Sequence, residues 1–512
     1  MENAIECRHI TKVFGKIVAN KDVSMDIRHG EILSLLGENG SGKTTLMNMI
    51  SGIYFPDSGE ILVNGKPVEI RDPGDAYKLG IAMVHQHFKL IDVFTALENI
   101  ALGLNDGKKF DLKKIREGAQ KICDRYDFDL DLNQKVYEMS VSQKQTLEIV
   151  KALYRGADVL ILDEPTAVLT PQESDKLFDV IRNMREDGKS VVIITHKLSE
   201  VMEISDRVTI LRQGEYVGTV VTKEASEAIL TEMMFGQKID LEIDRSEPKD
   251  LVRRLEIRHL IVHNKEGRRV VNDVSFDAFG GEILGIAGIS GNGQKELLEA
   301  VAGLQHCKAG SNITFYSGEK ADWPIQLVGK SAREIRQAGI HLAFVPEDRL
   351  GMGLVGSMDM VQNMMLKSYT KGAPVIADRK APKALAEVVK DRLHVKTPSI
   401  NTPVSQLSGG NVQKVLVGRE IASSPTVLMT AYAVRGLDVN TSYTIYNLLN
   451  EQKEKGVAVI YVGEDLDTML ALCDRILVLC GGRVNGIVDA RSVTKEEIGL
   501  RMTKMQDEGG NK

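Results

Sequence analysis

The chain has 512 residues, too many for one ordinary domain, so two or more domains are expected. Its composition, 43% apolar and 27% charged, is that of a soluble globular protein, and its net charge of −6 disfavours a nucleic-acid binder, whose surface is basic. Five scattered cysteines predict ordinary buried thiols instead of a disulfide or zinc framework. We expect no signal peptide, because charged residues such as Glu2, Glu6 and Arg8 interrupt any apolar core, and no apolar run approaches the roughly 18 residues of a membrane-spanning helix.

The chain contains the same long pattern twice. The stretch "VSMDIRHGEILSLLGENGSGKTTLMNMISG" is matched by "VSFDAFGGEILGIAGISGNGQKELLEAVAG" at an offset of 251 residues, from Lys43 to Gln294. A later pair, "SDRVTILRQGEYVGT" and "CDRILVLCGGRVNGI", repeats at an offset of 268, from Asp206 to Asp474. A repeat of this length indicates two copies of one domain. We predict the copies at residues 1–237 and 253–505, a charged linker at 238–252 and a frayed polar tail at 506–512.

Apolar runs in each copy alternate with helical patterns. The runs "EILSLL", "DVLILDE" and "SVVIITH" are short and rich in β-branched residues, with almost no polar alternation. Such runs are typical of parallel strands that are buried on both faces. We therefore predict an α/β layered domain with ligand loops at the strand ends, and mainly helical stretches at about 95–155 and 360–420.

The segment "GENGSGKT", Gly37–Thr44, fits the pattern of a phosphate-binding loop between a strand and a helix. Its glycines let backbone N–H groups turn toward phosphate, and the helix N-terminus adds partial positive charge. Lys43 supplies a cation for the β- and γ-phosphates, and Thr44 supplies a hydroxyl for Mg²⁺.

The strand "VLILDEP" ends in two adjacent carboxylates. Asp163 lies at the strand end, where it can join the Mg²⁺ shell, and Glu164 can polarise an attacking water as a general base. The alternative is a strand capped by two solvated acids. The phosphate loop upstream favours the catalytic interpretation.

Two further histidine patterns allow more than one interpretation. His196 ends the strand "SVVIITH" and can reach a γ-phosphate, although a lone histidine at a strand end is usually structural. His85 and His87 flank Gln86 and resemble metal ligands, but no third ligand is near, so a transition-metal site is not predicted.

These motifs, in this order, resemble those of the ATP-binding cassette (ABC) ATPases. The decisive segment is "LSGGNVQK", Leu407–Lys414, which is similar to the signature loop of that family. The resemblance covers nearly the whole chain. It implies two tandem P-loop ATPase domains, each with a RecA-like α/β core, an antiparallel β subdomain and a helical subdomain. In that family two cassettes pair head to tail, and each ATP lies between the phosphate loop of one and the signature of the other.

The resemblance also implies roles for individual residues. Lys43, Gln86, Glu164 and His196 would be catalytic, with Gln86 as the Q-loop residue and His196 as the switch histidine. Thr44, Gln86 and Asp163 would hold Mg²⁺. The implied ATP-binding residues are Phe14, which would stack on adenine, then Gly37, Glu38, Asn39, Gly40, Ser41, Gly42, Lys43, Thr44 and Thr45, and from the second copy Ser408, Gly409, Gly410 and Asn411.

The two copies have opposite defects. The first copy has the nucleotide loops, but its signature reads "MSVSQ", Met139–Gln143, with Val141 and Ser142 in place of the glycines. The second copy has the signature glycines. At the catalytic and metal-binding positions it has Gln294 for lysine, Lys295 for threonine, Glu347 for glutamine, Ala431 and Tyr432 for the two acids, and Glu464 for histidine. Lys265 has the place of Phe14. If the copies pair, one composite site is complete, with Asp438 leaning into it, and the other has lost both faces. Lys295 is one residue out of register and leaves open a phosphate contact at the second site.

The resemblance is strongest to the fused ATPase subunits of bacterial carbohydrate-type importers, through "LYRGADVLILDEPTAVLTPQES", "AFVPEDRLGMGLV" and "LSGGNVQKVLVGREIA". Among these it is most similar to nucleoside importers that use a lipoprotein receptor. Importers of ribose, galactose or xylose are the main alternative. The chain departs from both groups at "VSQ" and at "AYAVRG", which lie in the incomplete site.

Two other classes remain as alternatives: a soluble tandem-cassette factor acting on ribosomes, and a DNA-repair ATPase. The first usually keeps two working sites and a basic linker, and the second carries zinc-binding cysteines or long coiled coils. The importer resemblance implies ATP and Mg²⁺ as cofactors, two integral-membrane permease subunits as direct partners, a solute-binding lipoprotein as an indirect partner and no nucleic acid. It also implies a peripheral location at the cytoplasmic face of the cell membrane.

Overall fold

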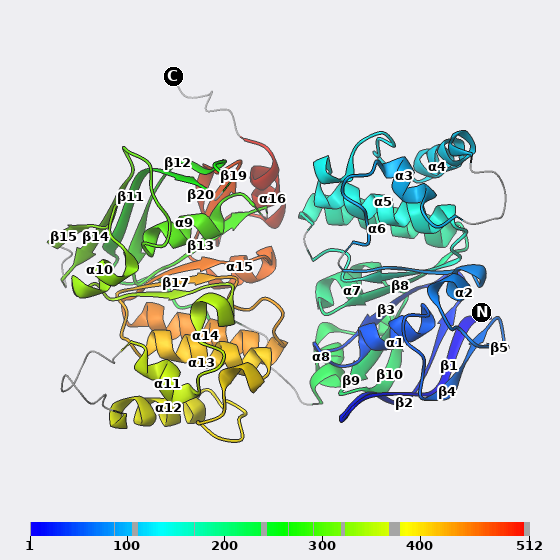
Figure 1. Ribbon diagram of the computed structural model, residues 1–512, viewed down its shortest axis with the longest axis horizontal. Helices are drawn as coiled ribbons and strands as arrows, with labels where there is room; N and C mark the ends of the chain where they lie inside the picture. The colour runs from blue at the N-terminus through cyan, green and yellow to red at the C-terminus, as the bar shows by residue number, and fades with distance from the viewer. Residues whose placement is uncertain are drawn as a thin grey trace. The chain divides into compact units, whose positions relative to one another are not determined.

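The computed structural model describes residues 2–86, 88–104, 111–167, 169–236, 243–264, 266–289, 291–318, 323–367 and 379–505. Its internal contacts divide the chain into two compact units, Met1–Asp240 and Leu241–Lys512, each of which is described by itself (Figure 1). None of the helices in these ranges combines the length and the apolar character that a bilayer crossing requires.

The first unit contains two sheets and two groups of helices. Its strands are β1 (Asn3–Phe14), β2 (Ile17–Arg28), β3 (Ile32–Leu36), β4 (Ser58–Val63), β5 (Lys66–Val68), β6 (Ile81–Val84), β7 (Val159–Asp163), β8 (Ser190–Thr195), β9 (Arg207–Arg212) and β10 (Glu215–Val221). Its helices are α1 (Lys43–Ile50), α2 (Pro73–Lys78), α3 (Ala96–Ala101), α4 (Leu112–Tyr126), α5 (Val141–Tyr154), α6 (Pro171–Glu186), α7 (Leu198–Ile204) and α8 (Glu227–Phe235), with 3₁₀ turns η1 (Val136–Glu138) and η2 (Thr222–Glu224).

The core sheet of the first unit has the strand order β10-β9-β3-β8-β7-β6. All neighbouring strands in it are parallel except β10 and β9. The central strands β3, β7 and β8 are buried at every position, because helices or the second sheet cover both faces. The second sheet, β2-β1-β4-β5, is antiparallel.

Helix α1 joins the two sheets of the first unit. Its Leu46, Met47 and Ile50 share one apolar cluster with residues of β1 and β3. On the opposite face of the core sheet, α5 and α6 pack on β7 and β8. Helices α3, α4 and α5 form a separate apolar cluster of their own, so the unit has an antiparallel part, a core sheet and a helical part.

The second unit repeats this architecture. Its strands are β11 (Val252–His263), β12 (Arg269–Gly280), β13 (Ile283–Gly288), β14 (Asn312–Ser317), β15 (Trp323–Gln326), β16 (Leu342–Val345), β17 (Val427–Ala431), β18 (Ala458–Val462), β19 (Arg475–Cys480) and β20 (Arg483–Asp489). Its helices are α9 (Gln294–Val301), α10 (Ala332–Gln337), α11 (Met360–Met365), α12 (Lys380–Arg392), α13 (Gly409–Ile421), α14 (Val439–Glu454), α15 (Leu466–Leu472) and α16 (Lys495–Thr503), with a π-helix η3 (Arg349–Gly353) and a 3₁₀ turn η4 (Val404–Gln406).

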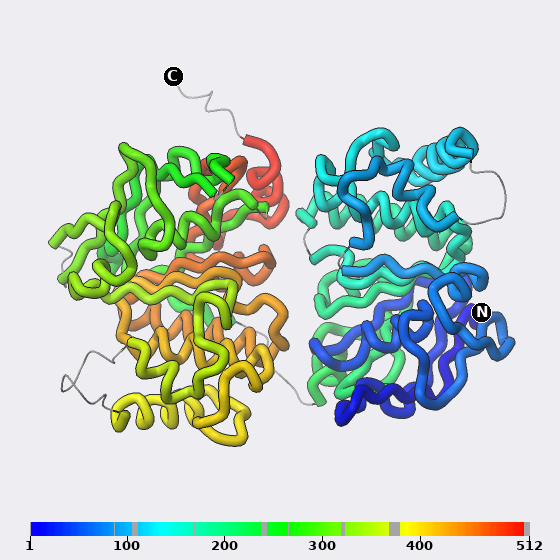
Figure 2. The backbone as a smooth tube through the Cα atoms, in the orientation of Figure 1, coloured from blue at the N-terminus to red at the C-terminus, as the bar shows by residue number. Residues whose placement is uncertain are grey.

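The strand orders of the second unit, β16-β17-β18-β13-β19-β20 and β12-β11-β14-β15, match those of the first. Helix α9 lies between the two sheets, and α14 covers the opposite face of the core sheet (Figure 1). The chain runs from the antiparallel sheet into the helical part and then returns, so that β20 lies beside β12 (Figure 2). The predicted α/β fold, with two tandem cassettes that each have antiparallel and helical parts, is confirmed.

The segment that precedes β11 is attached to the second unit. Residues 243–251 form neither helix nor strand. The carbonyl of Asp244 accepts a hydrogen bond from Asn450 at 3.3 Å, and the carbonyl of Ser246 accepts one from Lys453 at 2.5 Å. Arg245 donates to the carbonyls of Leu470 and Cys473. These contacts fix the later half of the predicted linker along α14 and α15.

Lys453 also forms a buried ion pair with Asp474 at 2.8 Å, with side chains 1% and 4% exposed. Because Asp474→Ala leaves the ammonium buried without its partner, we expect it to lower the free energy of unfolding of the second unit by about 3–5 kcal/mol. The measurement is urea unfolding of the full chain, with hydrogen exchange of the β18 amides as the probe of the second unit.

The first unit provides a matched control for this variant. Asp206, at the equivalent position, accepts a backbone hydrogen bond from Ile32, as Asp474 does from Ile283, but its ion-pair partner Arg185 is about one-third exposed. Loss of that exposed ion pair is expected to cost about 0.2–1 kcal/mol beyond the shared backbone bond. Equal losses in the free energy of unfolding for Asp206→Ala and Asp474→Ala would contradict the expectation that the buried ion pair contributes more than the exposed one.

Candidate nucleotide sites

The phosphate loop of the first unit connects β3 to α1. Gly40 and Gly42 have φ angles of +81° and +92°, and a Cβ on Gly42 would lie 2.4 Å from the carbonyl oxygen of Ala19. Glycine is therefore required at Gly42 by both conformation and space. Helix α1 begins directly after it, at Lys43, so the N-terminus of the helix points into the loop.

Lys43 lies inside this loop. Its Nζ donates hydrogen bonds to the carbonyl oxygens of Gly37 at 2.7 Å and Glu38 at 2.9 Å. Burial lowers the pKa of Lys43 to about 8, against the opposing effect of Glu164 and Asp163. The loop thus holds an ammonium group among backbone groups, as phosphate binding requires.

Thr44, in the first turn of α1, lies next to Asp163, the last residue of β7. The hydroxyl of Thr44 donates to Oδ1 of Asp163 at 3.3 Å. Burial raises the pKa of Asp163 to about 6, and the charge of Glu164 adds to this shift. A buried carboxylate beside a hydroxyl, with a second carboxylate adjacent, is an oxygen donor set that suits a divalent cation such as Mg²⁺.

Glu164 joins three strand ends. Its Oε2 accepts a hydrogen bond from Nε2 of Gln86 at 2.7 Å, and its Oε1 lies 3.0 Å from Nδ1 of His196. The residues follow β7, β6 and β8, whose carboxyl ends meet at one edge of the parallel sheet. The hydrogen bond from His196 is the main cause of the lowered pKa of Glu164. The structure therefore brings together Lys43, Thr44, Gln86, Asp163, Glu164 and His196.

Phe14 is the last residue of β1. Its ring is 40% exposed and meets Tyr54 edge to face at 5.1 Å, with Nζ of Lys12 at 5.4 Å from its centroid. Of the other predicted loop residues, Ser41 is buried, and its hydroxyl has no hydrogen-bond partner in the described part of the chain. Glu38, Asn39 and Thr45 occupy the loop and the first turn of α1.

The two signature segments differ at the start of their helices. In the first unit, Ser140 accepts a hydrogen bond from the N–H of Gln143, and the Gln143 side chain accepts one from the N–H of Ser140. This capping box satisfies two backbone donors at the start of α5. In the second unit α13 begins at Gly409, and no side-chain hydrogen bond caps it. Ser408 instead accepts a hydrogen bond from the side chain of Asn411 at 2.8 Å.

The phosphate-loop position of the second unit holds no cation. Gln294 is 2% exposed, and its Nε2 donates to the carbonyl of Ile289 at 3.2 Å, as Lys43 does to the equivalent carbonyl of Glu38. Lys295 is 44% exposed at its side chain and lies 4.0 Å from Glu299, one turn along α9. Lys265, at the position equivalent to Phe14, lies outside the described residues, and so does His87.

The strand ends of the second unit are joined by a residue that the sequence analysis did not single out. Arg435 pairs with Glu347 at 2.6 Å and with Glu464 at 3.1 Å. Tyr432 has the position of Glu164 and the same left-handed backbone, with φ of 51° against 47°. Burial raises the pKa of Tyr432 to about 12. The sequence signal for Arg435 was the pair of acids Glu347 and Glu464, which stand where the first copy has Gln86 and His196. Two carboxylates at one edge of a sheet indicate a cation near them.

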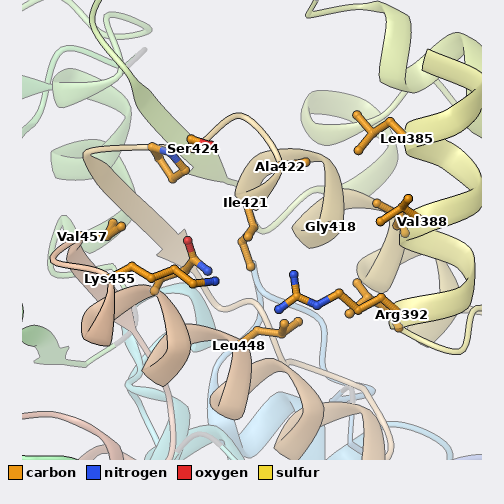
Figure 3. A pocket seen from close by; sticks show the side chains of 14 residues that line it. Leu385, Val388, Arg392, Gly418, Ile421, Ala422, Ser424, Leu448, Lys455 and Val457 are labelled. Carbon is orange, nitrogen blue, oxygen red and sulfur yellow. The ribbon is translucent and has the colours of Figure 1, made fainter. Parts of the chain in front are cut away.

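A cavity of about 460 Å³ lies elsewhere in the second unit, between α12, α13 and α14 (Figure 3). Arg392 and Lys455 reach toward one another across it, with Ile421 and Leu448 on either side. Pro425, also in its wall, precedes β17, so the cavity adjoins the amino ends of the strands. The nucleotide loops follow the carboxyl ends, so this cavity is separate from the nucleotide position.

A model of the "ABC transporter" family matches residues 20–167 and 271–430, one segment in each unit. The nucleoside import ATP-binding protein of Lactococcus lactis is 38% identical over 518 residues, covering 100% of this chain and 99% of the relative. The guanosine import ATP-binding protein of Bacillus subtilis is 40% identical over 517 residues, with the same two coverages.

The ribose import ATP-binding protein of Corynebacterium glutamicum is 37% identical over 502 residues, covering 97% of this chain and 93% of the relative. A crystal structure of a nucleotide-free ATP-binding cassette from an ABC transporter is 25% identical, with a TM-score of 0.41 over 46% of this chain and 96% of that chain. The family model and the full-length relatives agree with the motifs and the repeated fold. The chain belongs to the ABC transporter family, and it is an ATPase with two fused cassettes.

Proposed function

We propose that the chain is the ATP-hydrolysing subunit of a bacterial ABC importer that takes up nucleosides through separate permease subunits. The observation that carries this proposal is the full-length match to nucleoside and guanosine import ATP-binding proteins at 38% and 40% identity. Ribose is the second candidate solute, because the ribose import relative is 37% identical over nearly the same length.

ATP would be hydrolysed at one composite site. The first unit would supply Lys43, Gln86, Glu164 and His196, and the second would supply Ser408, Gly409, Gly410 and Asn411. The helix starts support this division, since α5 is capped by its own residues whereas α13 begins with two glycines and no side-chain cap. The neutral, buried Gln294 and the partly buried Tyr432 support the view that the other site lacks the chemistry for hydrolysis.

Mg²⁺ would be held by Thr44, Asp163 and Gln86, whose oxygen atoms suit a hard cation. When bound, the ion neutralises charge on the β- and γ-phosphates. Lys43 would hold those phosphates from the other side, and Phe14 would stack on the adenine. Glu164 would accept a proton from the attacking water, while His196 orients its carboxylate.

The direct partners would be two integral-membrane permease subunits. The helical segments that follow Gln86 and Glu347, which contain α3 and α11, would contact their cytoplasmic loops. The chain would then lie at the cytoplasmic face of the cell membrane as a peripheral protein, with a solute-binding lipoprotein as an indirect partner. The solute would pass through the permeases without touching this chain.

Deletion of the chain is expected to abolish uptake of radiolabelled nucleosides and to leave ribose uptake unchanged. Wild-type chain should restore uptake, whereas the Glu164→Gln variant should not. A panel of nucleosides, ribose, galactose and xylose in the deletion strain distinguishes the two candidate solutes. Loss of ribose uptake with intact nucleoside uptake would overturn the nucleoside assignment and favour the sugar.

A further inference from the structure

Three loops at one edge of the second unit are tied together by one guanidinium group. Arg435 lies in the loop between β17 and α14, Glu347 follows β16 and Glu464 follows β18. The ion pairs measure 2.6 Å and 3.1 Å, and all three side chains are between one-third and one-half exposed. Single exposed ion pairs contribute only about 0.2–1 kcal/mol. Two pairs that share one planar group, however, restrain three loops at once.

The first unit has a different arrangement at the same edge. The positions equivalent to Glu347, Arg435 and Glu464 hold Gln86, Ala167 and His196. There the anion Glu164 joins Gln86 and His196. In the second unit the signs are exchanged, because a cation joins two anions. Each edge is therefore joined by side chains of its own unit, through an anion in the first unit and through a cation in the second.

This cluster extends to the signature turn of the same unit. Arg349, in η3, donates a hydrogen bond to the backbone carbonyl of Arg435. Its Nη1 lies 3.2 Å from the place that a Cβ on Gly409 would occupy, so the guanidinium packs against the signature backbone. Burial lowers the pKa of Arg349, in keeping with a closely packed position.

Gly410, the second signature glycine, packs against the first turn of α14. A Cβ on Gly410 would lie 3.2 Å from Oγ1 of Thr441 and 3.3 Å from Oδ2 of Asp438. Asp438 caps α14 through the N–H of Thr441 and is three residues beyond Arg435 in the same loop. Both signature glycines thus contact groups whose positions depend on the loop that holds Arg435.

We propose that Arg435 is a positioning residue for ATP hydrolysis. By joining Glu347 and Glu464, it fixes the loop between β17 and α14, which in turn holds Arg349 and Asp438 against Gly409 and Gly410. The signature turn is thereby ordered before the cassettes close on ATP, and the edge that has lost its nucleotide chemistry serves to support the complete site. This inference rests on the proposed composite site.

The test compares Arg435→Ala with Arg392→Ala in the full-length chain. Arg392 pairs with Glu451 at a similar exposure, on α12 and α14, beside the cavity at the amino ends of the strands. We expect Arg435→Ala to raise amide exchange in residues 407–414 about tenfold and to lower kcat for ATP about tenfold, or about 1.4 kcal/mol. KM for ATP should stay within about twofold, because the nucleotide loops lie in the first unit. Arg392→Ala should change neither quantity.

Two further variants keep the test decisive. Arg435→Lys should recover part of kcat, since an ammonium can pair with one of the two acids. The double variant Glu347→Gln, Glu464→Gln removes the ion pairs and leaves the arginine. It should show the same tenfold losses of protection and of kcat that are expected for Arg435→Ala, so the test does not depend on the folding of Arg435→Ala. Unchanged exchange in residues 407–414, or faster exchange with unchanged kcat, would overturn the positioning role. Failure of the composite site itself would show separately, as normal turnover in the Gly410→Asp variant.

Discussion

Glu164→Gln is expected to lower kcat for ATP hydrolysis by about 10³-fold while ATP binding is retained. The substitution keeps the size of the side chain and its contact with Gln86, but an amide cannot accept a proton from the attacking water. General-base catalysis typically contributes about 10²–10⁴-fold. Lys43 and the phosphate loop are untouched, so the affinity for ATP should change little. Phosphate release gives kcat, and binding of a fluorescent ATP analogue gives the affinity.

Gln294→Ala is the control for this variant. Gln294 has the position of Lys43 in the second unit, is buried and, among the described residues, donates to the carbonyl of Ile289. Its truncation should leave kcat within about twofold of the wild-type value, provided that the chain folds. Near-normal turnover in Glu164→Gln, or a loss in Gln294→Ala as large as the loss expected for Glu164→Gln, would show that the catalytic residues have been assigned to the wrong unit.

Gly410→Asp is expected to lower ATP turnover by at least about 100-fold, although it lies in the other unit from Glu164. In the proposed composite site this position would face the γ-phosphate, and juxtaposed like charges cost several kcal/mol, where about 2.7 kcal/mol corresponds to 100-fold. The new side chain would also start 3.3 Å from Oδ2 of Asp438, which adds a second repulsion. The effect should be on hydrolysis, measured by phosphate release, with ATP affinity reduced much less.

The repeated fold supplies a matched control. Ser142 has the position of Gly410 in the first unit, within the capped start of α5. Ser142→Asp therefore introduces the same charge at the site that lacks hydrolytic residues, and it should change kcat by less than about twofold. Equal losses in Gly410→Asp and Ser142→Asp would contradict a single composite site.

The structure shows how the nucleotide position of the second unit differs from that of the first. Its phosphate-loop lysine is replaced by a neutral, buried amide, and its general base by a partly buried tyrosine whose pKa is raised to about 12. Lys295, the remaining candidate for a phosphate contact, is paired with Glu299 at 4.0 Å along α9. These features oppose turnover at this edge, where the Arg435 ion pairs join the loops that follow three strands.

The sequence by itself determined the two copies, their α/β class and the identity of the nucleotide loops. These are local patterns: buried parallel strands appear as continuous β-branched runs, and a phosphate loop needs its glycines and lysine at fixed spacing. The capping box at Ser140 and Gln143 was also readable from the sequence as a Ser-x-x-Gln pattern, although the sequence analysis did not use it.

Only the tertiary structure decided which side chains meet. Glu164 joins Gln86 and His196, and Arg435 joins Glu347 and Glu464, because parallel strands far apart in the sequence end at one edge of a sheet. The attachment of Asp244 and Ser246 to α14 likewise depends on packing and not on local pattern. Sequence spacing fixes which residues a loop carries, whereas the direction of a side chain and its partner are fixed by the packing of neighbouring elements.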